Sequence, residues 1–189
     1  MRITGGEFGG RTLLVPKTDA IRPTQDRVRE SLFSILQPEI GGSVFLDLFA
    51  GSGSVGLEAL SRGAAHTTFV EGSRRHADVL VRNLQALRAE SRAEVVVANA
   101  YRWISSYVGP GFTVAFTDPP YALGEERGYA QVLATLAARN VVREDGLFIA
   151  EMTAVQRAEE TPGWELLRDR TYGKTRICIW RRLAIKKES

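Results

Sequence analysis

A glycine-rich run lies between an apolar segment and a stretch of helical character. It reads Asp47-Leu48-Phe49-Ala50-Gly51-Ser52-Gly53-Ser54-Val55-Gly56. Glycines at this spacing let the backbone turn sharply and come close to a ligand at the helix N-terminus. Glu71 ends the next apolar segment, about 20 positions later, where a carboxylate grips ribose hydroxyls. The pattern therefore predicts a pocket for a nucleoside cofactor.

The acid in front of the glycines favours one cofactor over another. The glycine pattern and Glu71 fit both NAD and S-adenosylmethionine, because each carries a ribose. Asp47 would repel a pyrophosphate but would attract the ammonium of a methionine moiety, directly or through water, which favours S-adenosylmethionine. Asn99-Ala100 follows the third predicted strand, where an adenine amino group would be recognised, although Asn99 could equally cap a helix. Alternatively, the glycines only pack the helix against the strand.

A second run, Asp118-Pro119-Pro120-Tyr121, follows another apolar segment. The prolines fix φ and remove backbone donors, so the local backbone presents acceptors only. The Asp118 carboxylate and the Pro119 carbonyl would accept the two hydrogens of an exocyclic amine, and Tyr121 would stack on the base. The two runs together predict an S-adenosylmethionine-dependent N-methyltransferase that needs neither a metal nor a covalent nucleophile. The alternative is a plain strand-ending turn with Tyr121 packed on the core.

Such a pocket cannot reach a base inside a duplex. The predicted substrate base must lie in a loop or be flipped out, and single-stranded or distorted RNA fits best.

The remaining sequence predicts the elements that position these residues. Short apolar runs alternate with helical stretches, which is typical of an α/β fold with a mostly parallel sheet and helices on both faces. Strands are predicted at 44–48, 67–70, 94–98, 114–117 and 147–151, and helices at 54–62, 74–88, 101–107 and 129–140. Two later extended runs, 164–171 and 176–182, are joined by a turn short enough to force an antiparallel hairpin.

The N-terminal region is predicted to precede this body. Residues 2–16 are typical of a glycine-punctuated hairpin. A helix is predicted to begin with Thr24 as its N-cap and to end at Pro38. We expect a single domain over residues 1–189, with 1–21 as a hairpin appendage and 22–189 as the cofactor-binding and catalytic body.

Composition and charge limit the classes of protein that the chain can belong to. The chain has 189 residues and a formal charge of +3, which suits a polyanionic partner without requiring one. Basic residues gather near the N-terminus: Arg2, Arg11, Lys17, Arg22, Arg27 and Arg29. No apolar run approaches the ~20 residues that span a bilayer, and the first residues lack a secretory signal, so we expect a cytoplasmic protein. The lone Cys178 rules out disulfides within the chain and cysteine-based zinc sites.

Four stretches resemble one known family. They are residues 22–33, which begin Arg-Pro-Thr, residues 46–64 around the glycines, residues 118–121, and the closing Tyr172-Gly173. In these the chain is similar to the bacterial small-subunit (16S) rRNA guanine-N2 methyltransferases. The resemblance implies a Rossmann-like fold of seven strands, S-adenosylmethionine as cofactor, S-adenosylhomocysteine as product and no metal. It also implies a guanine N2 target in a 16S rRNA hairpin loop, within the 30S subunit or an assembly intermediate. We expect a monomer.

The resemblance completes the predicted site. The residues predicted to bind the cofactor are Thr24, Asp47, Phe49, Gly51, Gly53, Glu71, Gly72, Asn99 and Ala100. Thr24 and its neighbours would close over the methionine end. Asn99 stands where relatives usually carry aspartate, so an amide oxygen would accept the adenine N–H. The predicted RNA contacts are Arg2, Arg11, Lys17, Arg22 and Arg27.

Three other functions stay open. Asp-Pro-Pro-Tyr serves any exocyclic amine, so a methyltransferase for adenine N6 or cytosine N4 in DNA or other RNA is the closest. The glycine pattern also fits a nucleotide-binding oxidoreductase or regulatory module. The third is a non-catalytic RNA-binding protein, in which Asp47, Glu71 and Asp118 would have no role.

Overall fold

The structure, a computed structural model, describes residues 1–16, 23–119 and 129–184, without the side chains of residues 23–25. Contacts divide the chain into two compact units, Met1–Ala100 and Tyr101–Ser189. The described residues form seven strands, the number that the family resemblance implied. No helix in these ranges is long and apolar enough to cross a membrane.

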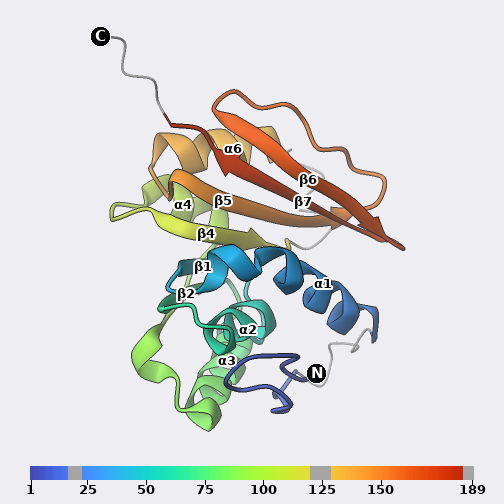
Figure 1. Ribbon diagram of the computed structural model, residues 1–189. Helices are drawn as coiled ribbons and strands as arrows, with labels where there is room; N and C mark the ends of the chain where they lie inside the picture. The colour runs from blue at the N-terminus through green and yellow to red at the C-terminus, as the bar shows by residue number, and fades with distance from the viewer. Residues whose placement is uncertain (17–22, 120–128, 185–189) are drawn as a thin grey trace. The chain divides into compact units, whose positions relative to one another are not determined.

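The first unit is built on three parallel strands (Figure 1). The strands are β1 (Val44–Leu48), β2 (His66–Glu71) and β3 (Ala93–Val97), in the order β3-β2-β1. The helices are α1 (Pro23–Ile40), α2 (Ser54–Ser61), α3 (Arg74–Leu87) and the short η1 (Glu90–Arg92). Asp47 is opposite Phe69, and Glu71 is opposite Val97. Because the strands are parallel, their carboxyl ends meet at one edge, where ligands bind in folds of this kind.

The second unit combines parallel and antiparallel pairing, as predicted. Its strands are β4 (Phe112–Thr117), β5 (Val142–Thr153), β6 (Trp164–Tyr172) and β7 (Thr175–Arg182), in the order β4-β5-β7-β6. Its helices are α4 (Ala100–Ser106), which begins at the last residue of the first unit, and α6 (Tyr129–Ala138). β4 and β5 are parallel, while β7 is antiparallel to both β5 and β6.

The interior of the second unit is aromatic. Trp180 and Trp164 are buried against Phe148, and the Trp164 indole donates to the Leu133 carbonyl of α6. Cys178 of the same strand as Trp180 is also buried, and burial raises the pKa of its thiol to about 12. The thiol therefore stays protonated and unreactive at neutral pH.

Several predicted boundaries are wrong. Helix α1 begins at Pro23, so Thr24 lies in its first turn instead of at its N-cap. Helix α1 continues past Pro38 to Ile40, because a proline in the last turn removes only one intrahelical donor. Strand β5 begins at Val142 instead of Leu147, because an irregularity shifts the pairing with β4 there. The irregular stretch carries polar residues, and Asp145 has φ 60°. An apolar-run criterion therefore missed it.

The N-terminal hairpin is confirmed in a reduced form. One isolated antiparallel bridge joins Arg2 to Thr12, and the Ile3 amide donates to the Arg11 carbonyl at 3.0 Å. Gly6 and Gly10 turn the chain with φ values of 77° and 82°. The segment forms a closed loop without continuous strands.

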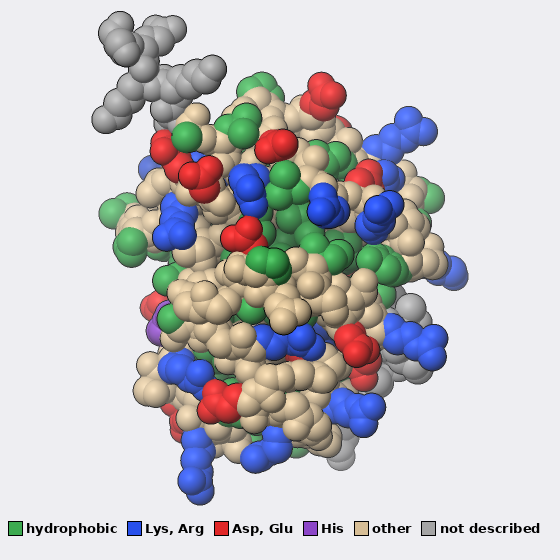
Figure 2. Space-filling model, viewed as in Figure 1, with side chains coloured by type: hydrophobic (Ala, Val, Ile, Leu, Met, Phe, Trp, Pro, Cys, Tyr) green, Lys and Arg blue, Asp and Glu red, His purple; other side chains and the backbone are tan. Residues whose placement is uncertain are grey.

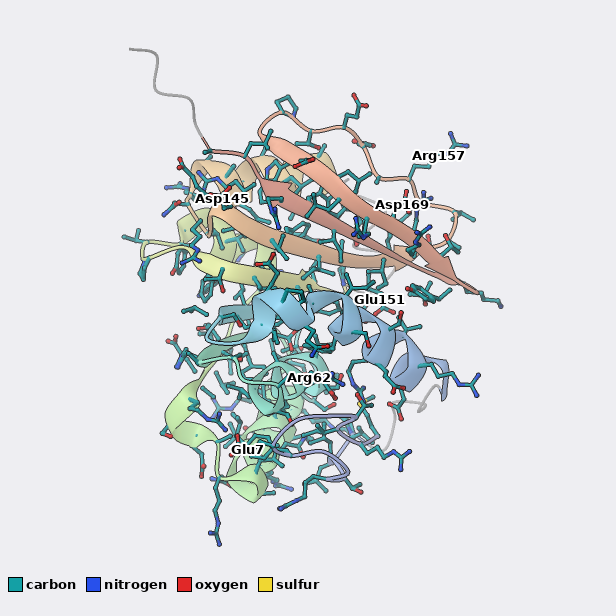
Figure 3. The ribbon with its side chains drawn as sticks, in the orientation of Figure 1. Glu7, Arg62, Asp145, Glu151, Arg157 and Asp169 are labelled. Carbon is teal, nitrogen blue, oxygen red and sulfur yellow. The ribbon has the colours of Figure 1, made fainter. Side chains whose placement is uncertain are left out.

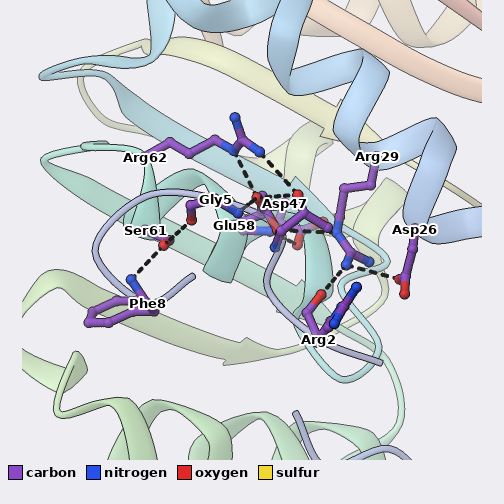
Figure 4. Close-up of polar contacts among 11 residues, drawn as sticks. Arg2, Gly5, Phe8, Asp26, Arg29, Asp47, Glu58, Ser61 and Arg62 are labelled. Atoms are coloured by element: carbon purple, nitrogen blue, oxygen red, sulfur yellow. Dashed lines mark hydrogen bonds and ion pairs between the residues drawn. The ribbon is translucent and has the colours of Figure 1, made fainter. Parts of the chain in front are cut away.

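A buried carboxylate fastens this hairpin to the unit. Glu58 of α2 is 0% exposed. It accepts hydrogen bonds from the Thr4 amide (2.8 Å), the Thr4 hydroxyl (2.7 Å) and the Gly5 amide (3.0 Å). Arg62 and Arg29 donate to it through their Nε atoms at 2.7 and 3.3 Å (Figure 4). Five hydrogen-bond donors thus replace the water that the Glu58 carboxylate loses on burial.

Ser61, three residues further along α2, makes a second attachment. Its hydroxyl donates to the Gly5 carbonyl at 2.6 Å and accepts from the Phe8 amide at 2.8 Å. A Cβ at Gly6 would lie 1.9 Å from the Ser61 carbonyl oxygen, so the hairpin approaches α2 too closely for any side chain there.

We predict that Glu58→Gln lowers the free energy of unfolding by about 3 kcal/mol, because an amide directs hydrogens toward donors and removes the carboxylate that pairs with Arg62 and, beside Asp26, with Arg29. Chemical denaturation followed by circular dichroism measures the loss. The matched control is Glu30→Gln on the exposed face of α1. Equal effects of the two substitutions would contradict the role assigned to Glu58.

Candidate active site

The glycines of the loop after β1 have different roles. Gly51 and Gly53 have φ values of 57° and 86°, which non-glycine residues rarely adopt. A Cβ at Gly56 would lie 2.3 Å from the Phe69 ring, so this glycine lets α2 pack on β2. A Cβ at Gly51 would meet no atom within 4 Å. The loop is therefore tightly packed at its helical end and open at Gly51, where a ligand can approach the backbone.

Phe49, between β1 and the glycines, is strained. Its φ is 59°, a left-handed value that costs an aromatic residue about 1–3 kcal/mol. Strained residues of this kind cluster at ligand sites, which supports the inclusion of Phe49 in the predicted pocket.

Asp47 has a structural role that the sequence analysis missed. It is 2% exposed, and its Oδ2 accepts from the Gly56 amide at 2.8 Å. Gly53 occupies the N-cap position of α2 and has no side chain to cap the helix. Asp47 supplies the missing acceptor and places a negative charge at the positive end of the helix. Its contact with a methionine ammonium stays a prediction.

Glu71 is held in one orientation. Its Oε2 accepts from the Gly51 amide and its Oε1 from the Ser73 amide, each at 2.7 Å. The His76 Nδ1 atom lies 3.9 Å from Oε1. Each carboxylate oxygen has a second lone pair, so the same group can also accept from ribose hydroxyls. The carboxylate is therefore preorganised beside the open part of the loop.

The other predicted cofactor residues lie near this edge or outside the described part. The Ala98 amide donates to the Glu71 carbonyl at 3.0 Å, which ties the end of β3 to the end of β2. This contact places Gly72 and Asn99, both exposed, close to the Glu71 backbone. Ala100 is buried at the start of α4. The side chain of Thr24 lies outside the described residues.

Asn83 of α3 is a supporting residue that the sequence analysis also missed. It is 1% exposed, and its Nδ2 donates to the Ser52 and Leu14 carbonyls, each at 3.0 Å. Its Oδ1 accepts from the Leu14 amide at 2.8 Å. The signal was an asparagine on the apolar face of a helix, where a polar side chain must find partners.

The second predicted motif is described only in its first half. Asp118 and Pro119 directly follow β4; Asp118 is exposed and Pro119 is buried. Pro120 and Tyr121 lie outside the described residues. In the same unit, Thr117 is opposite Ala150 of β5, so Glu151 comes next to Asp118 in register.

Tyr129, at the start of α6, belongs to the same neighbourhood. Its hydroxyl donates to the Glu151 carbonyl at 3.1 Å. Burial raises the pKa of Tyr129 well above its ordinary value, and the nearby Tyr101, Asp118, Cys178 and Glu151 groups raise it further. The hydroxyl therefore remains a neutral hydrogen-bond donor.

The predicted RNA contacts have different environments. Arg2, Arg11 and Arg27 are exposed, and the Arg11 guanidinium donates to the Ala86 carbonyl at 2.9 Å. Arg29, which is near them in the sequence, is 4% exposed and bonded to Glu58 and Asp26, so it belongs to the interior of the first unit. On the face shown in Figure 2, basic and acidic side chains are interspersed.

Lys17 and Arg22 lie outside the described residues. Within residues 1–16, 23–119 and 129–184, no group of three or more His, Cys, Asp or Glu side chains is arranged to hold a metal ion.

Comparison with known proteins identifies the family. Residues 1–181 match the family described as Conserved hypothetical protein 95. The chain is also similar to ribosomal RNA small subunit methyltransferase D of Escherichia coli (strain K12), with 38% identity over 97% of this chain and 91% of that protein. The chain belongs to the ribosomal RNA small subunit methyltransferase D family. The resemblance seen in its motifs is thereby confirmed.

Solved structures of methyltransferases have the same fold. A structure described as putative methyltransferase yhhF from Escherichia coli has a TM-score of 0.86 and 37% identity, covering 98% of this chain and 99% of that one. A second, SMU.776, a putative methyltransferase complexed with SAH, has a TM-score of 0.68 and 17% identity, covering 85% of this chain and 50% of that one. The second comparison concerns the fold alone. This member of the methyltransferase D family thus has the predicted Rossmann-like fold with antiparallel C-terminal strands.

We predict that Glu71→Ala weakens the binding of S-adenosylhomocysteine at least about tenfold, because it removes the acceptor for ribose and the partner of the Gly51 amide. Calorimetric titration measures the dissociation constant. Glu90→Ala, an exposed acid on η1, is the control. Unchanged affinity in Glu71→Ala would remove Glu71 from the cofactor site.

Proposed function

We propose that this protein is an S-adenosylmethionine-dependent methyltransferase that acts on the exocyclic N2 of a guanine in 16S rRNA. The observation that carries the proposal is the exposed Asp118 followed by Pro119 at the carboxyl end of β4, in a chain of this family. The open glycine loop and the preorganised Glu71 support the cofactor. The relative's name, which specifies small-subunit ribosomal RNA, supports the substrate.

The residues of the first unit fit the cofactor chemically. Glu71 would hold the ribose hydroxyls, Asp47 the methionine ammonium, and Asn99 the adenine amino group. Gly51 and Phe49 would line the open part of the loop, and Thr24, Gly72 and Ala100 complete the proposed set. When bound, S-adenosylmethionine supplies an electrophilic methyl group, whose C–S bond breaks as the N–C bond to the amine forms. None of these contacts needs a metal ion.

The second unit would hold the acceptor amine. The lone pair of a guanine amino group is delocalised into the ring, which makes the nitrogen a weak nucleophile. Asp118 and the Pro119 carbonyl would accept its two hydrogens and favour the geometry that exposes the lone pair. Asp118 would then take the proton that the alkylated nitrogen must lose. In the same proposal, Pro120 restricts the backbone and Tyr121 stacks on the base.

The partner in this proposal is 16S rRNA within the 30S subunit or an assembly intermediate. Arg2, Arg11, Lys17, Arg22 and Arg27 would contact phosphates. Residues 1–189 would act as one domain, with 1–21 as the RNA-contacting segment. The same proposal expects a cytoplasmic monomer.

Product analysis tests the function. The protein and methyl-labelled cofactor would be incubated with 30S particles, with naked 16S rRNA or with DNA in separate reactions. Each substrate would then be digested to nucleosides. Labelled N2-methylguanosine is expected. A labelled nucleoside that carries N6-methyladenine or N4-methylcytosine would establish the alternative amino-methyltransferase. In a separate calorimetric titration, binding of NAD without binding of S-adenosylhomocysteine would favour the nucleotide-binding oxidoreductase or regulatory module.

We predict that Asp118→Ala lowers methyl transfer at least about 1,000-fold, because both an orienting acceptor and the proton acceptor are lost. The affinity for S-adenosylhomocysteine should change less than about twofold, since Asp118 is not among the proposed cofactor contacts. Single-turnover kinetics and calorimetry measure the two effects. Glu144→Ala, at an exposed acid of β5, is the control. Retained turnover in Asp118→Ala would overturn the assignment.

We predict that Arg27→Ala reduces the slope of log Kd for the RNA substrate against log salt concentration by about one, because one phosphate contact is lost. Arg27 is exposed on α1. Filter binding at several salt concentrations measures the slope, with the exposed Arg139→Ala as the control. Equal slopes for the two variants would show that Arg27 is only surface charge.

A further inference from the structure

Asp118 has an acidic neighbour in the second unit. Strands β4 and β5 are parallel, with Phe116 opposite Ile149 and Thr117 opposite Ala150. Asp118 and Glu151 each follow the last of these pairs by one residue, so continuing the register by one step brings Asp118 level with Glu151. Residues opposite each other in adjacent strands share a face and lie about 5 Å apart. Glu151 is half-buried near the end of β5 (Figure 3).

Tyr129 fixes the backbone at this point. Its hydroxyl donates to the carbonyl of Glu151 at 3.1 Å, and its ring stacks on Trp180 with centroids 6.5 Å apart. Both Asp118 and Glu151 are close enough to Tyr129 to influence the pKa of its hydroxyl. A rigid aromatic base therefore supports the Glu151 backbone beside the proposed amine site.

The position next to the amine distinguishes the nucleobases. In guanine, the ring nitrogen beside the N2 amine carries a hydrogen, so the edge presents three N–H bonds in a row. In adenine and cytosine, the ring nitrogen beside the amine has a lone pair. A carboxylate facing this position accepts from guanine and repels the other two, since an ionised carboxylate only accepts hydrogen bonds.

We propose that Glu151 accepts the N1–H of the target guanine and so selects guanine over adenine and cytosine. This inference rests on the proposed function and adds a specificity-determining residue to it. Asp118 and the Pro119 carbonyl accept the amine hydrogens, and Glu151 accepts the third hydrogen of the same edge. The Asp-Pro-Pro-Tyr run can bind any exocyclic amine, and the Glu151 carboxylate of β5 selects the guanine ring.

The test replaces the target guanine by 2-aminopurine, which keeps the 2-amino group but has a lone pair at N1. The substrates are 30S particles reconstituted with guanine or with 2-aminopurine at the nucleotide that product analysis shows to be methylated. We expect the wild-type protein to prefer guanine about 100-fold or more in kcat/KM, because a site built to accept a hydrogen rejects an analogue that lacks it. Glu151→Gln should lower this preference at least about tenfold, since its amide can donate to the lone pair.

Two further variants complete the design. Glu144→Gln makes the same charge change at an exposed position of β5 and should keep the wild-type preference. Glu151→Asp keeps an acceptor and should retain more of the preference than Glu151→Gln, which gives a second measurement if one variant folds poorly. The loss of O6 from 2-aminopurine affects every variant alike, so the change in preference isolates N1.

Two results would overturn the inference while the proposed function stands. The wild-type protein could methylate both particles equally, or Glu151→Gln could change both rates by the same factor. If the wild-type protein formed no N2-methylguanosine on the guanine particle, the proposed function would fail, and this inference with it.

Discussion

The first unit depends on the buried carboxylate of Glu58. A charge at 0% exposure is tolerated only when donors surround it, and here they come from three separate segments. Thr4 and Gly5 donate from the hairpin, Arg29 from α1 and Arg62 from the end of α2. One side chain therefore fixes the N-terminal residues against the helix that follows the glycine loop. The same helix is capped by Asp47 from β1, so the loop lies between two carboxylate attachments.

The proposed functional groups of both units stand at the ends of parallel strands. In the first unit, Glu71 ends β2 and holds the Gly51 amide. In the second, Asp118 follows β4 and Glu151 lies near the end of β5. Parallel pairing brings such ends together without any contribution from long loops, since the register alone decides which residues are neighbours. The strain at Phe49 shows the local cost of turning the chain at such an end.

Local patterns in the sequence predicted much of this arrangement. The glycines and Glu71 lie within one strand–helix–strand stretch, and β1 was predicted with the boundaries that the structure has. The antiparallel β6–β7 pair was predicted because its short turn permits no other pairing. Glu58 and Asn83 were missed because their partners are 54 and 69 positions away along the chain. The neighbourhood of Asp118, Tyr129 and Glu151 was missed because only the register of β4 and β5 brings it together.

The contacts of Asn83 change how the N-terminal segment should be understood. This side chain binds both backbone groups of Leu14 and also the Ser52 carbonyl of the glycine loop. A protein shortened to begin after residue 16 would lose the Leu14 donor to the Asn83 amide oxygen and the Thr4 and Gly5 donors to the Glu58 carboxylate, and it would open both buried groups to water. Residues 1–16 are therefore part of the packed structure of the first unit. A deletion intended to remove only the proposed RNA-contacting segment would also disturb the glycine loop beside Glu71.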